Sequence, residues 1–63
     1  MNELIEMIVK TAKMLDAEGY AAGGSTKDLI VETVDYLEDE DMLEISDVTN
    51  EIFDAVKTQL IEG

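Results

Sequence analysis

Residues 25–39, which read STKDLIVETVDYLED, carry the clearest structural signal in the sequence. Ile30, Val34 and Leu37 recur in this stretch at steps of four and three residues, so they lie along one face of an α-helix. Ser25 is followed three residues later by an acid, which is the spacing of a capping box at the start of a helix. We therefore predict a helix that begins directly after Ser25 and fills the rest of the stretch.

Two further stretches, one on each side, show the same helical periodicity. The first ends at Gly19, which suits the end of a helix because glycine readily adopts the left-handed conformation. The second can be capped by Ser46 or Asp47. The sequence therefore predicts an all-α fold, a compact three-helix bundle with short loops that forms a single domain over residues 1–63. The three predicted helices cover about residues 2–18, 26–39 and 47–61.

The connection between the second and third predicted helices admits two interpretations. Met42, Leu43 and Ile45 interrupt a run of acids there. They could belong to an irregular loop, or residues 42–45 could form a short extended stretch that packs beneath the bundle. The sequence leaves both interpretations open.

The composition excludes several classes of function. The chain has 63 residues, with 16 Asp and Glu against 4 Lys and Arg, a formal net charge of −12, and no Cys or His. A domain this short buries only about 60% of its unfolded surface, which leaves little room for a deep enzyme pocket. Without Cys and His, disulfides and the usual structural zinc sites are excluded. The negative charge opposes direct binding to nucleic acid, because phosphates are bound by Lys and Arg.

Two features of the sequence bear on where the protein acts. No apolar run approaches the roughly 20 residues of a membrane span. The first residues, MNELIE, lack the basic start of a signal peptide. We expect a soluble, cytoplasmic protein that does not bind membranes.

The acids are concentrated from Asp28 to Asp54, a stretch that contains eleven carboxylates and no basic residue. In the second predicted helix, four acids at steps of four, three and four residues stay within a wedge of about 60°, opposite the apolar stripe. The third predicted helix repeats the four-then-three step. The acids of the two stripes are Asp28, Glu32, Asp35 and Asp39 in the second helix, and Asp47, Glu51 and Asp54 in the third.

Such stripes oppose helix stability. Like charges three or four residues apart repel by roughly 0.2–0.5 kcal/mol per pair, so the five pairs would cost on the order of 1–2.5 kcal/mol. A small domain has only about 5 kcal/mol of net stability. A helix face that merely contacts solvent usually intersperses Lys among the acids. The pattern therefore favours a functional role, while acidity for solubility alone is the competing interpretation.

We interpret the acids as one near-continuous negative face that binds a basic surface of a partner protein. The most specific form of this interpretation is that the partner uses that surface to bind nucleic acid. Exposed aromatic residues are typical binding anchors, so the two tyrosines are included in the predicted surface. Its members are Asp28, Glu32, Asp35, Glu38, Asp39, Asp41, Glu44, Asp47, Glu51, Asp54, Tyr20 and Tyr36. In size and charge the chain is similar to small acidic phage inhibitors of bacterial defence or DNA enzymes. That resemblance implies an inhibitor that mimics DNA or RNA.

Other chemistries find weaker support in the residues. The run from Asp39 to Glu44 departs from a calcium-binding EF-hand loop, because Leu43 stands where an oxygen ligand belongs and Glu44 where glycine belongs. Acids on a solvent-exposed face lack the burial that tunes a catalytic carboxyl group. We therefore predict no enzyme, no catalytic residue, no metal site and no cofactor.

Ser25 at the start of an acidic helix resembles the attachment serine of acyl carrier proteins, which would imply a phosphopantetheine arm. Gly24 and Thr26 stand where that family has Asp and Leu, so the motif departs from the family at both flanks. An acyl-carrier-like protein is thus a further alternative.

The first predicted helix carries more apolar residues than one core-facing stripe requires. Met7, Val9 and Met14 fall outside its central stripe. In a monomer the other two helices could cover both sides, whereas in a homodimer these three residues would contact the second copy. Because small cores supply little net stability, we predict a homodimer with Met7, Val9 and Met14 in its interface. A structural or regulatory homodimer that binds its partner through this apolar helix is the alternative function.

Overall fold

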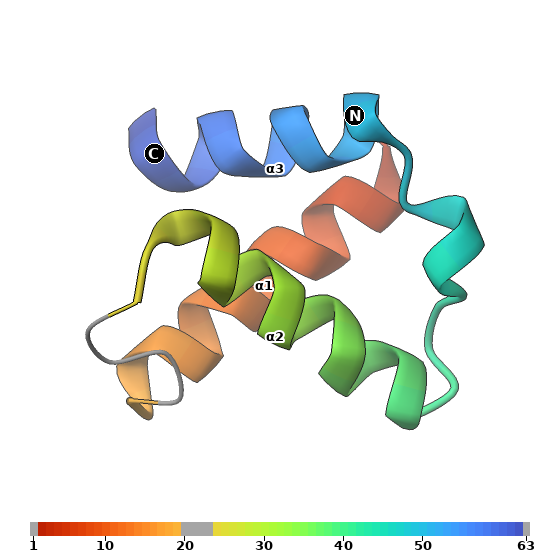
Figure 1. Ribbon diagram of the computed structural model, residues 1–63, viewed down its shortest axis with the longest axis horizontal. Helices are drawn as coiled ribbons and strands as arrows, with labels where there is room; N and C mark the ends of the chain where they lie inside the picture. The colour runs from red at the N-terminus through yellow and green to blue at the C-terminus, as the bar shows by residue number, and fades with distance from the viewer. Residues whose placement is uncertain (1, 20–23, 63) are drawn as a thin grey trace.

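Within residues 2–19 and 24–62, which the computed structural model describes, the chain forms three α-helices, one short 3-10 helix and no strand (Figure 1). The predicted all-α three-helix bundle is confirmed. No helix in this part of the chain is long and apolar enough to cross a membrane. The elements are α1 (Glu3–Ala17), α2 (Thr26–Asp39), the 3-10 helix η1 (Ile45–Asp47) and α3 (Asn50–Glu62).

The core lies where the three helices meet. Each α-helix contacts the other two, and η1 packs beside α2 (Figure 1). Ile8 of α1, Ile30 of α2 and Val56 of α3 belong to one cluster and are completely buried. Each helix thus supplies at least one fully buried branched side chain, which explains why the apolar positions of the sequence recur with helical spacing.

The first two helices begin and end as the sequence predicts. The Asn2 side chain accepts a hydrogen bond of 2.7 Å from the Leu4 N–H at the start of α1. At the start of α2, the Ser25 hydroxyl accepts from the Asp28 N–H, and the Asp28 carboxylate accepts from the Ser25 N–H. Both arrangements satisfy N–H groups that have no partner within the helix. Gly19 follows α1 with a φ of 84°, the left-handed conformation expected there.

The start of the third helix differs from the prediction. Residues 45–47 form η1, and α3 begins only at Asn50. The Thr49 hydroxyl, and not Ser46 or Asp47, accepts a hydrogen bond of 3.3 Å from the Ile52 N–H. The predicted caps are therefore wrong. The helical spacing misleads here because Val48 packs against the core from outside α3.

The stretch 42–45 combines features of both interpretations offered by the sequence. Leu43 packs against the core, and the backbone of Glu44 is extended. Met42 belongs to the turn that ends α2, and Ile45 opens η1, so the extended backbone does not run through the whole stretch.

The revised start of α3 predicts different effects for two neighbouring hydroxyl residues. Thr49→Ala removes the cap and should lower the free energy of unfolding by about 1 kcal/mol. Ser46→Ala, in the exposed η1, should change it by less than about 0.5 kcal/mol. Urea unfolding followed by circular dichroism measures both. A larger loss for Ser46→Ala than for Thr49→Ala would contradict this assignment.

Candidate functional site

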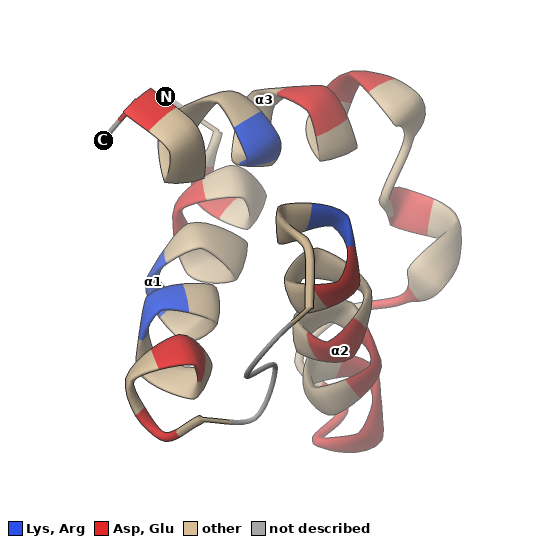
Figure 2. Cartoon of the chain, turned by 60° about the vertical axis from the view of Figure 1, so that its left-hand side comes forward, with Lys and Arg blue, Asp and Glu red and all other residues tan. Residues whose placement is uncertain are grey.

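All eleven carboxylates from Asp28 to Asp54 are exposed to solvent, and we call them together the acidic surface. They come from α2, from the connection that contains η1, and from α3 (Figure 2). The acidic surface consists of Asp28, Glu32, Asp35, Glu38, Asp39, Glu40, Asp41, Glu44, Asp47, Glu51 and Asp54.

On α2 the four acids of the predicted stripe lie on the side away from the core. Asp35 and Asp39 are exposed, whereas Val34 and Leu37 beside them are buried. Asp28 also completes the capping box described above. Its carboxylate therefore has a structural role as well as a place on the acidic surface.

The acids beyond α2 do not continue a single helical stripe. Asp47 lies in η1, so the predicted four-then-three step along one helix does not apply to it. Glu51 and Asp54 are on the outer side of α3. Because the buried sides of α2 and α3 meet at one core, their outer sides point in different directions (Figure 2). The acidic surface is therefore convex, curving from α2 over the connection to α3.

The C-terminal end of α2 holds the densest group of acids. Four acids in a row, Glu38 to Asp41, occupy its last turn and the residues directly after it, and that turn has no basic residue. The C-terminus of a helix carries a partial negative charge, so acids there are unfavourable. This repulsion adds to that between neighbouring carboxylates of the stripe.

Asp41 adds a backbone cost at the same place. The Met42 N–H donates to the Leu37 carbonyl at 2.9 Å, and the Asp41 N–H donates to the Glu38 carbonyl at 3.0 Å, which together form a Schellman motif. Asp41 has a φ of 58°, in the left-handed region that favours glycine. Gly19 occupies the equivalent position after α1. The chain thus places an acid where glycine would be more stable.

The four lysines lie outside the acidic surface. Lys10 and Lys13 are on α1, Lys27 is in the first turn of α2, and Lys57 is in the second half of α3. Figure 2 shows acidic residues in red, and no basic residue, along the connection and the C-terminal end of α2. The connection and the C-terminal end of α2 therefore carry acids and no lysine, whereas α1 carries charges of both signs.

The two tyrosines of the predicted surface have different outcomes. Tyr36 is exposed on α2 and lines a shallow hollow of about 210 Å³ together with Leu15, Glu32 and Asp39. It is therefore available as an aromatic contact within the acidic surface. Tyr20 lies outside the described residues.

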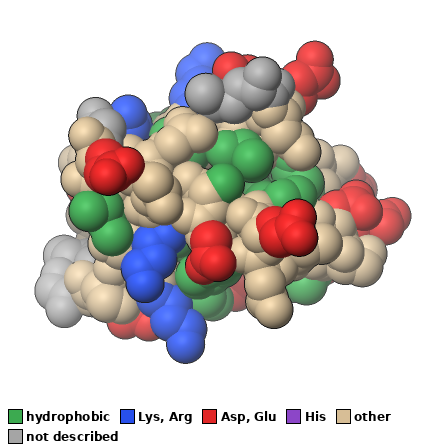
Figure 3. All heavy atoms as spheres, turned by 90° about the horizontal axis from the view of Figure 1, so that it is seen from above, with side chains coloured by type: hydrophobic (Ala, Val, Ile, Leu, Met, Phe, Trp, Pro, Cys, Tyr) green, Lys and Arg blue, Asp and Glu red, His purple; other side chains and the backbone are tan. Residues whose placement is uncertain are grey.

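The predicted dimer interface is only partly exposed in a single chain. Val9 is buried in the core, so it is not the outward-facing residue that the sequence predicted, and Met7 packs partly against the same cluster. Met14 is 45% exposed. Hydrophobic side chains also reach the surface on the side where α3 lies (Figure 3). Ile61 of α3 is 63% exposed. Apolar exposure therefore does not single out α1, and a homodimer through that helix stays a prediction.

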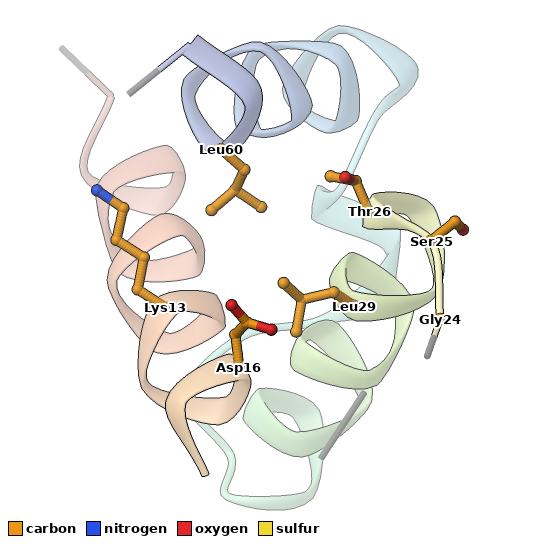
Figure 4. Close-up of a pocket in the computed structure, with 7 residues that line it drawn as sticks. All are labelled: Lys13, Asp16, Gly24, Ser25, Thr26, Leu29 and Leu60. Carbon is orange, nitrogen blue, oxygen red and sulfur yellow. The ribbon is translucent and has the colours of Figure 1, made fainter. Parts of the chain in front are cut away.

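A hollow of about 220 Å³ lies between α1, the start of α2 and α3, and Ser25 is among the residues around it (Figure 4). The Ser25 side chain points away from the hollow, while the Asp16 carboxylate points into it (Figure 4). The hydroxyl group instead accepts the capping hydrogen bond of α2. This geometry gives Ser25 a structural role.

Carboxylates crowd the surface without converging on one point. In the part of the chain that the structure describes, no group of three acids could hold a metal ion. Comparison with known protein families, with curated proteins and with solved structures found no match.

The unfavourable position of Asp41 can be tested by exchanging residues between the two helix ends. Asp41→Gly should raise the free energy of unfolding by about 1 kcal/mol, because it relieves both the backbone strain and one charge at the helix C-terminus. Gly19→Asp should lower it by a similar amount for the same reasons. Urea unfolding measures the free energy of unfolding of both variants. If Asp41→Gly were less stable than the wild type, Asp41 would not be in an unfavourable position.

Proposed function

We propose that this protein acts by binding, and that its acidic surface docks on the basic, nucleic-acid-binding surface of a partner protein and inhibits it. The observation that carries the proposal is the placement of Glu38 to Asp41. These acids stand at the negative end of α2, and one of them occupies a left-handed position. Departures from locally favourable chemistry tend to occur at functional sites.

The spacing of the acids supports mimicry of nucleic acid. Carboxylates three or four residues apart on a helix have Cβ atoms about 5–6 Å apart. One DNA strand advances about 3.4 Å along the helix axis per phosphate, and its backbone path is longer. The α2 stripe therefore gives a coarse likeness of a phosphate row. The convex shape of the acidic surface suits a concave basic groove.

Binding of this kind has defined physical consequences. Opposite charges accelerate association, and the affinity falls as salt screens them. No covalent step or cofactor is required. Within this proposal the protein acts in the cytoplasm, and anti-defence inhibitors of phages are the class that its size and charge resemble.

The test compares two variants that remove the same charge. The stripe variant carries Glu32→Gln, Asp35→Asn and Asp39→Asn, which neutralise three of the four acids of the α2 stripe. It keeps Asp28, which completes the capping box of the helix. The control variant carries three neutral substitutions on or beside α1. Those substitutions are Glu6→Gln, Asp16→Asn and Glu18→Gln.

Each protein is immobilised and exposed to nuclease-treated bacterial lysate. We expect the wild type and the control to retain a nucleic-acid-binding protein that added duplex DNA or high salt releases. The stripe variant should bind that protein about tenfold or more weakly, because charge pairs at its interface are lost. Equal retention by the stripe variant and the control would contradict the proposal and favour a role in solubility alone.

A further inference from the structure

An open apolar groove of about 190 Å³ lies within the acidic surface, between α2, the connection and α3. Val34 and Phe53 belong to its floor, because both pack in the core cluster. The full lining is Val31, Val34, Asp35, Ile45, Val48 and Phe53.

Two of the lining side chains are unusually open to solvent. Val31 is 45% exposed and Ile45 is 46% exposed, although they come from different elements. Single exposed hydrophobic residues are common on protein surfaces. Here, however, two branched side chains and the edge of the core line one hollow, which is the arrangement of a binding groove.

The charges around the groove restrict what can occupy it. Asp35 is part of the lining, and acids directly precede or follow other lining residues in the sequence. The nearest lysines in the sequence, Lys27 and Lys57, lie one helical turn from Val31 and Phe53 and do not line the groove. The acids next to lining residues in the sequence are Glu32, Glu44, Asp47 and Asp54, of which Glu32 lines the hollow beside Tyr36 and not the groove. A second copy of this chain would bring two Asp35 carboxylates and two chains of formal charge −12 together, and their repulsion opposes that occupant.

We propose that the groove receives an aliphatic side chain from the basic partner, flanked by Lys or Arg residues that pair with Asp35 and with other acids of the acidic surface. This inference rests on the proposed function. It adds an apolar contact to the charge pairs, which a row of phosphates does not offer. Interfaces typically combine a desolvated apolar anchor with a charged rim. The preferred partner is therefore an amphipathic basic segment, such as a helix with Leu on one face and Lys on the other.

The probe is a fluorescein-labelled helical peptide of Leu and Lys, compared with a matched peptide in which Gln replaces every Leu. Fluorescence anisotropy gives the affinity of each peptide for three proteins. These are the wild type, Ile45→Ser in the groove, and Ile61→Ser, which alters an exposed apolar residue that does not line the groove. Circular dichroism shows whether each variant is folded. If Ile45→Ser does not fold, Val31→Ser takes its place as the groove variant.

We expect Ile45→Ser to weaken binding of the Leu–Lys peptide by about five- to tenfold, since it removes a large apolar contact. Ile61→Ser should bind this peptide as the wild type does, and the Gln–Lys peptide should not distinguish the variants. Equal affinity of Ile45→Ser and wild type for the Leu–Lys peptide would overturn the groove assignment. So would a wild-type dimer that Ile45→Ser dissociates in sedimentation, because a second copy would then be the occupant.

The stripe variant separates this inference from the proposed function. If neutralising Glu32, Asp35 and Asp39 leaves both peptides bound as tightly as before, the acidic surface does not attract basic partners and the proposed function fails. If it weakens both peptides while Ile45→Ser weakens neither, the proposed function stands and only the groove assignment fails.

Discussion

The packing of Ile8, Ile30 and Val56 into one buried cluster fixes how the three helices are oriented. In a chain of 63 residues such a core yields only a small net stability. Each helix must turn one side toward this cluster, which fixes the outer side of each helix at the same time. The α2 stripe thus lies opposite the buried side of its helix, and Glu51 and Asp54 lie on the outer side of α3. The convex shape of the acidic surface follows from the way that three amphipathic helices share a single core.

Local chemistry agrees with the fold at the helix starts and conflicts with it at the end of α2. Asn2, Ser25 and Thr49 all cap helices, so each start is stabilised by the residue that precedes it. At the end of α2 the sequence instead places consecutive acids beside the negative helix terminus, and Asp41 occupies a left-handed position. A surface needed only for solubility could carry the same charge at places where it destabilises the helix less. This contrast within one small protein is the reason to relate the acids to a partner.

The fold could be predicted from the sequence because independent signals agree at α2. The periodic apolar residues and the capping box indicate the same start, and the observed helix, Thr26–Asp39, has the predicted bounds. At α3 the signals conflict, since Val48 stands four residues before Ile52 and continues the helical spacing although the chain is not helical there. The acids of the candidate site could be identified from spacing alone. The groove could not, because it forms only when η1 packs beside α2 and brings Ile45 near Val31. No local pattern encodes that contact.

If the acidic surface is maintained at a cost to the stability of the fold, the free energy of unfolding should depend on salt. The free energy of unfolding of the wild type is measured by urea denaturation at increasing concentrations of NaCl. Screening should relieve the repulsion among the acids, because the Debye length falls from roughly 30 Å at 0.01 M salt to about 3 Å at 1 M. We expect the stability to rise by on the order of 1 kcal/mol over this range. A stability that is constant or falls with salt would show that the carboxylates impose no cost, and the reason for assigning them a partner would be lost.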